Sequence, residues 1–176
     1  MKKAIVILFT LLISYSSCKK IDKLTNFYIN YTETYTLGAF LDADSNFELN
    51  AYTIGNDLNE LYKTNNTNQG SIKKITLDSF AIIIKSPDTT TFDFAQSVNI
   101  YITSKGLDKK KIAWTDGILK NGLQEIELQV SDDDIQNYIN SYDYVLINQL
   151  IIDSKINYKL VVDIDYTYLV TANLSN

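Results

Sequence analysis

The chain has 176 residues and is acidic, with 16 basic residues, all Lys, against 21 Asp plus Glu and a formal net charge of −5. It contains no Arg and no His, and an acidic chain without Arg lacks the bidentate phosphate clamp that suits nucleic-acid binding. Without His, a Ser-His-Asp triad, a Cys–His pair and an ordinary zinc or copper site are excluded.

Residues 1–17 have the features of a secretory signal peptide. Lys2 and Lys3 give a positive start, residues 4–13 are almost wholly apolar, and small residues precede Cys18. The apolar run is about half of the ~20 residues that a membrane-spanning helix needs. We therefore expect residues 1–17 to be removed rather than to stay in the membrane as an anchor.

The segment 14–17, Ser-Tyr-Ser-Ser, followed by Cys18 resembles the lipobox of bacterial lipoproteins in its relaxed Bacteroidota form. The resemblance implies cleavage before Cys18 and acylation of its thiol and amino group, which would hold the protein stably on the outer membrane. Residues 18–25 would form a tether. Residues 19–23 lack the acidic run that resembles the surface-export signal of this group, so we expect the protein to face the periplasm.

Residues 26–174 are expected to form a single domain that begins with strands. Residues 27–37 alternate apolar and polar side chains, with Glu33 as an interruption on the apolar face, and this period of two predicts a half-buried strand. A second strand is predicted over residues 47–54. Residues 57–63, preceded by an Asn, predict a short capped helix.

The middle of the chain predicts further strands separated by turns. Residues 72–85 predict a long strand whose centre is apolar on both faces, and such a strand belongs in the middle of a packed structure. Pro87 ends this strand. A strand around residues 98–102 is followed by a Lys-rich loop, residues 105–111, and by a short apolar segment at residues 112–115.

Two local signals then follow. Asn121-Gly122 predicts a hairpin turn that leads into a strand at residues 126–130. Ser131 is followed by three Asp, so Ser131 as cap and Asp134 as its reciprocal partner predict a helix that runs to about Asn140.

Residues 144–152 and 158–170 predict the last two strands, which we expect to pair as a hairpin. The count of seven or eight strands with one or two short helices favours a mainly β fold, an antiparallel Ig-like β-sandwich. Residues 128–145, a strand, an acidic helix start and a further strand, resemble the crossover of small uncharacterised Bacteroidota lipoproteins with Ig-like domains. That resemblance covers about the last hundred residues and implies no established activity.

The turn at residues 42–48 alternates oxygen-bearing side chains, as a hard cation such as calcium requires. Phe47 stands where a calcium loop has glycine, and Thr53 stands where it has a closing Glu. We therefore interpret the segment as an acidic, solvated turn and expect no metal. The candidate ligands are Asp42, Asp44, Asn46 and Glu48.

Two pairs of carboxylates, Glu125 with Glu127 and Asp163 with Asp165, each lie two residues apart on predicted strands. Each pair shares one sheet face at a spacing of ~6.5–7 Å, and a glycosidase also uses two carboxylates. Both pairs alternate with apolar residues, which places the acids in solvent. We therefore expect no catalytic residue.

Aromatic residues are numerous, with 13 Tyr and a single Trp, and exposed aromatic rings can stack on sugars. Most of the tyrosines fall on the apolar phase of strands, where core packing explains them. Trp114 lies beside the predicted Lys-rich loop and is the candidate ligand-binding residue. Lys109-Lys110-Lys111 is interpreted as part of that solvated loop.

The triplet Asp88-Thr89-Thr90 in a predicted turn resembles the O-glycosylation signal of exported Bacteroidota proteins, which makes Thr89 a candidate modification site. We expect a lipid-anchored, non-enzymatic component of the cell envelope, with no cofactor, that binds or assembles with another envelope protein. The alternatives are a glycan-binding accessory lipoprotein of a polysaccharide-uptake system and a carboxylate-dependent hydrolase.

Overall fold

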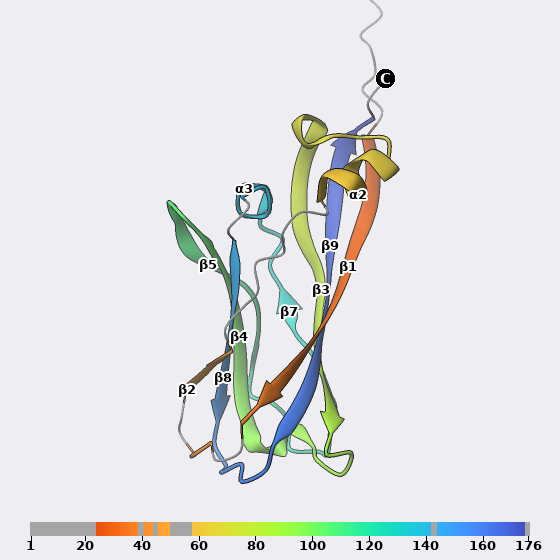
Figure 1. Ribbon diagram of the computed structural model, residues 1–176. Helices are drawn as coiled ribbons and strands as arrows, with labels where there is room; N and C mark the ends of the chain where they lie inside the picture. Colours follow the sequence, from red (N-terminus) through yellow and green to blue (C-terminus); the bar gives the residue numbers. More distant parts are fainter. Residues whose placement is uncertain (1–23, 39–40, 44–45, 50–57, 142–143, 175–176) are drawn as a thin grey trace, which may run out of the picture.

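The computed structural model describes residues 24–38, 41–43, 46–49, 58–141 and 144–174. These residues form two antiparallel β-sheets that lie face to face around one core (Figure 1). The predicted antiparallel β-sandwich is thereby confirmed. The helices of the described residues are too short, and not apolar enough, to cross a membrane.

The two sheets have four and five strands. Sheet I contains, in spatial order, β1 (Leu24–Leu37), β9 (Leu160–Asn173), β3 (Ile72–Ser86) and β6 (Glu125–Glu127). Sheet II contains, in spatial order, β2 (Asn46–Leu49), β8 (Val145–Ile152), β4 (Ala95–Ser104), β5 (Leu107–Asp116) and β7 (Gln129–Val130). The helical elements are α2 (Leu58–Thr64), η1 (Gln69–Ser71), η2 (Phe92–Phe94) and α3 (Gln136–Ile139).

The first strand pairs with the last over its whole length, from Leu24 opposite Asn173 to Leu37 opposite Leu160. Successive strands mostly alternate between the sheets, so the strand order is that of a jelly roll, with β7 as a short additional edge strand, instead of the Ig order. The predicted hairpin of the last two strands is wrong, because β8 belongs to sheet II and β9 to sheet I. The sequence predicted residues 144–152 as a strand apolar on both faces and residues 158–170 as a regular alternation, and neither pattern carries information on the partner of the strand.

Two predicted loops also differ from the structure. The Lys-rich residues 108–111 lie within β5 and not in a loop, because β5 pairs with β4 through a tight turn at Gly106, whose φ is 81°. Gly122 does take a turn conformation, with a φ of 80°, yet the turn is not a hairpin because β5 and β6 lie in different sheets. A run of charged residues fits an exposed stretch of a strand as well as it fits a loop, so composition alone did not distinguish the two.

The two predicted helices had different outcomes. The first is confirmed as α2, whose buried Tyr62 contacts Phe27 of β1 with ring centroids 6.4 Å apart. The second begins later than predicted, because residues 131–135 are not helical. Asp134 Oδ1 accepts the N–H of Ile75 at 3.2 Å and that of Gln136 at 3.0 Å, which ties this segment to β3 before the helix can start.

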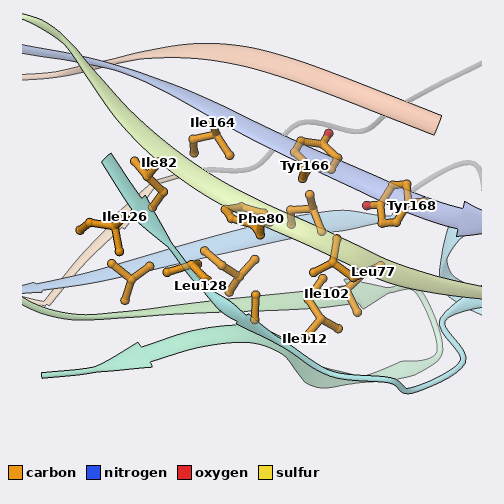
Figure 2. Close-up of a cluster of buried hydrophobic side chains, with 14 of the residues drawn as sticks. Leu77, Phe80, Ile82, Ile102, Ile112, Ile126, Leu128, Ile164, Tyr166 and Tyr168 are labelled. Carbon is orange, nitrogen blue, oxygen red and sulfur yellow. The ribbon is translucent and has the colours of Figure 1, made fainter. Parts of the chain in front are cut away.

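The core lies between the sheets and is built from the inward phase of each strand. Figure 2 shows Phe80, Ile82 and Tyr166 of sheet I facing the layer that contains Ile102 and Ile112 of sheet II. Each fully buried large apolar side chain contributes about 1.5–3 kcal/mol. The centre of β3 was expected to be apolar on both faces, and its outward residues are half-buried on the outer face of sheet I.

Candidate ligand-binding groove

A groove of about 510 Å³ runs over the outer face of sheet I and draws on all four of its strands. This volume falls within the range of about 300–1,000 Å³ typical of small-molecule sites. The residues that line the groove are Asn30, Tyr31, Thr32, Asp78, Ser79, Phe80, Ala81, Glu127, Leu128, Asp165, Tyr166 and Thr167.

The strand register sets the floor of the groove. Thr32 of β1 lies opposite Asp165 of β9, which lies opposite Ala81 of β3, which lies opposite Glu127 of β6. All four side chains belong to the outward phase, since their neighbours Tyr166 and Phe80 are buried in the core. Ala81 leaves space between the two carboxylates because its side chain is a single methyl group.

A second row of polar side chains lies next to the first. Asn30 pairs with Thr167, and Thr167 pairs with Ser79. The Thr167 hydroxyl donates to Asn30 Oδ1 at 2.9 Å, which orients the amide across the groove. The register of β3 shifts between Leu77 and Ser79, and this bulge leaves Asp78 exposed at the rim.

Asp165 is the most shielded acid of the groove. It lies half-buried on β9, a central strand, and its Oδ1 is inaccessible and has no hydrogen-bond partner among the described residues. Buried acceptors are normally satisfied, and those that are not often mark a functional position. Asp165 is therefore the acid lining the groove that has a buried carboxylate oxygen without a hydrogen-bond partner among the described residues.

One exposed aromatic ring lies on the same face. Tyr28 is 58% exposed and precedes Asn30 by two residues on β1, so both side chains point outward. It pairs with the half-buried Leu169 of β9. Tyr28 thus places an exposed aromatic surface on the same face as the groove, two residues along β1 from the lining residue Asn30.

The structure brings the two predicted carboxylate pairs onto one face. Asp165 and Glu127 line the groove, while Asp163 and Glu125 lie in the next row, on either side of Ile83. The Asp163 carboxylate already has partners within the protein, since it accepts a hydrogen bond from the Thr34 hydroxyl at 2.6 Å and lies 3.6 Å from the Lys85 ammonium. The alternation of apolar and polar residues predicted that these acids face outward. It did not predict that β3 pairs with both β6 and β9, which brings the two pairs onto one sheet.

Trp114 lies elsewhere, on the outer face of sheet II. It pairs with Asn99 of β4 and Gln129 of β7, and the Lys111 ammonium lies 5.0 Å from its ring centroid. On the same face, Lys109 lies 4.3 Å from the ring centroid of Tyr101. Lysine side chains therefore lie over both rings, and neither ring lines the groove.

The candidate metal ligands do not converge in the part of the chain that the structure describes. Asp42 lies 3.0 Å from the Lys155 ammonium, and Glu48 accepts a hydrogen bond from Gln149 at 2.6 Å. Asp44 and the side chain of Asn46 lie outside the described residues. Nowhere in the described ranges do three or more acids or Cys gather as a metal site would require.

The two candidate modification sites are placed differently. Thr89 is exposed in a turn that the N–H of Thr90 closes by donating to the carbonyl of Pro87 at 3.1 Å. Cys18 lies outside the described residues. Lipidation of Cys18 and glycosylation of Thr89 both stay predictions.

Comparisons with known proteins give little beyond the fold. No protein-family model and no curated protein matches the chain. One solved structure, from work on the promiscuous specificity of carbohydrate-binding modules from the β-sandwich superfamily, matches 84% of this chain at 13% identity and a TM-score of 0.30. The match covers 57% of that chain, so this chain spans less than two thirds of it. No functional conclusion follows from a likeness at this level.

Proposed function

We propose that this protein is a lipid-anchored, non-enzymatic binding protein of the cell envelope that holds a glycan in the groove of sheet I. The observation that carries the proposal is the groove itself: about 510 Å³, floored by hydroxyl, amide and carboxylate side chains, with the exposed Tyr28 on the same face. The expected protein partner stays a prediction, since the groove suits a small polar ligand better.

The lining groups match the chemistry of a sugar. Sugar hydroxyls donate to carboxylates such as Asp165 and Glu127, and charge-assisted bonds of this kind are stronger than neutral ones. The Thr32 hydroxyl and the Asn30 amide can both donate and accept. The apolar face of a sugar ring can lie on Tyr28, whose ring offers apolar surface beside a polar hydroxyl.

The geometry favours binding over hydrolysis. A glycosidase places two carboxyl groups on opposite sides of one glycosidic bond. Asp165 and Glu127 instead lie side by side on one sheet face, separated by Ala81, with their backbones about 9–10 Å apart at the spacing of two strands. Both acids therefore approach a bound sugar from the same side.

A glycan panel screened with the detergent-solubilised protein tests the proposal, with calorimetry on each hit. Tyr28→Ala removes the ring on which a sugar can lie, and Asp165→Asn removes a charged acceptor. Each should weaken binding about tenfold or more, which corresponds to about 1.4 kcal/mol. Trp114→Ala is the control because Trp114 lies on the other sheet. No saturable binding, or loss of binding only in Trp114→Ala, would contradict the groove assignment, and release of sugar products would favour a hydrolase.

A further inference from the structure

We propose that the groove selects its glycan by charge, accepting neutral and amine-bearing sugars and excluding acidic ones. This inference rests on the proposed function and names the ligand class of the same groove. Three carboxylates, those of Asp78, Glu127 and Asp165, line the groove, and no Lys is among the lining residues.

Lys85 is engaged by an acid outside the groove, since its ammonium lies 3.6 Å from Asp163, one row away from Asp165. Lys74, further along β3, adds its charge to that of Lys110 at Asp133, which also lies outside the groove. The negative field of the groove is therefore not cancelled by a cation of the protein at its floor.

The position of Asp165 strengthens this field. Its Oδ1 is inaccessible to water and has no hydrogen-bond partner among the described residues, so this oxygen of the carboxylate is unsolvated. Charges act more strongly on one another where water is excluded, and a concave surface lined by one sign of charge concentrates its field. An acidic sugar would place a further anion beside this carboxylate, whereas an ammonium group would neutralise it.

Hydrogen bonding acts in the same direction as charge. Carboxylates only accept hydrogen bonds when ionised, and an ammonium group offers three donors. The hydroxyls of a neutral sugar can also donate to Asp165 and Glu127. The carboxylate of an acidic sugar can donate nothing, so an acidic group of the protein that faces it is left without a donor.

The test uses three oligosaccharides of one backbone and length: β-1,4-linked N-acetylglucosamine, free glucosamine and N-succinylglucosamine, which are neutral, cationic and acidic. Calorimetry with the detergent-solubilised protein should show the acidic oligomer binding at least about tenfold more weakly than the neutral one, by like-charge repulsion. The cationic oligomer should bind at least as tightly as the neutral one, and its advantage should shrink between low salt and about 0.15 M salt.

Matched variants locate the effect. Glu127→Gln should reduce the preference for the cationic over the acidic oligomer several-fold, and Asp78→Asn should do so to a smaller extent because Asp78 lies at the rim. Glu125→Gln is the control: Glu125 lies on the same strand and the same face but outside the lining of the groove.

Equal binding of the neutral and acidic oligomers would overturn the charge selection and leave the proposed function standing. An equal effect of Glu125→Gln and Glu127→Gln would do the same, since it would assign the preference to overall charge instead of the groove. Failure of all three oligomers to bind, together with an empty glycan panel, would overturn both proposals.

Discussion

Glu33 shows how one residue can break a sequence pattern for a structural reason. It lies on the inward phase of β1, where it accepts hydrogen bonds from the hydroxyls of Tyr35 and, at 2.8 Å, Tyr166. Tyr166 stacks between Phe80 and Tyr31, with ring centroids 5.6 and 5.3 Å away. Glu33 therefore satisfies a hydroxyl that burial among aromatic rings would otherwise leave unpaired.

We predict that Glu33→Ala lowers the free energy of unfolding by about 1–3 kcal/mol, the cost of leaving a buried polar group without its partner. Glu33→Gln keeps an acceptor at the same position and should cost clearly less. Urea denaturation of both variants measures the difference. Equal stability of Glu33→Ala and the unmodified protein would mean that water replaces the carboxylate.

The buried tyrosines make the fold sensitive to alkali. Burial, and then the proximity of Tyr31, raises the pKa of Tyr62 to about 12, and burial raises the pKa of Tyr144, Tyr166 and Tyr168 as well. Unfolding returns each of them to about 10. The unfolded chain thus loses protons first as the pH rises, so stability is fully present below pH ~10 and is lost above it.

We predict that the midpoint of urea denaturation falls steeply as the pH rises from about 10 to 12, with Tyr62 alone accounting for about 2 kcal/mol over that range. Absorbance of ionised tyrosine should appear together with unfolding and not before it. Tyr62→Phe is the matched variant, and its stability should depend less on pH in this range. Tyrosine ionisation in a still folded protein would contradict the prediction.

At the scale of elements, the sequence predicted where strands lie better than which strands pair. Residues 126–130 alternate without a break, yet the chain changes sheets at Leu128, whose N–H donates to Phe80 of sheet I at 2.9 Å. Soon after, Ser131 donates to Ile112 of sheet II at 2.9 Å. A period of two is the same in both sheets, so nothing in the pattern marks the change.

The groove was unpredictable for the same reason. Its acids were recognised as outward-facing, but Glu127 and Asp165 are far apart in sequence and become neighbours only because β3 pairs with both of their strands. The role of Ala81 as the small residue between them depends on the same pairing. Trp114, by contrast, was predicted to bind a ligand from its residue type and its place beside the Lys-rich segment, and the structure places a Lys ammonium near its ring.

Asp134 connects two elements through hydrogen bonds, so its substitution should destabilise both. Its Oδ1 accepts the N–H groups of Ile75 in β3 and Gln136 in α3. We predict that Asp134→Ala lowers the free energy of unfolding by about 1–2 kcal/mol, as for the loss of a helix cap. Asp132→Ala is the control, since Asp132 is exposed on the same segment. Chemical denaturation compares the two, and equal effects would contradict the role of Asp134.

At the scale of the whole molecule, the position of β1 relates the groove to the predicted anchor. Residues 19–23 separate Cys18 from Leu24, the first residue of β1, and an extended chain of this length reaches at most about 20 Å. Thr32 lies eight residues further along β1, or about 26 Å at the rise of a strand. An acylated Cys18 would therefore hold the Leu24 end of the sandwich near the membrane, and the groove would stand clear of the lipid head groups when β1 runs away from the membrane surface.

We predict that Cys18→Ala abolishes acylation and moves the protein out of the detergent-extracted membrane fraction, because stable anchoring requires at least two acyl chains. Glycan binding by the released protein should be unchanged, since the groove lies far along β1 from the anchor. Fractionation before and after a high-salt wash, with calorimetry on the soluble variant, measures both. Membrane retention of Cys18→Ala through the wash would refute the anchor, and loss of binding on release would show that the groove depends on the membrane.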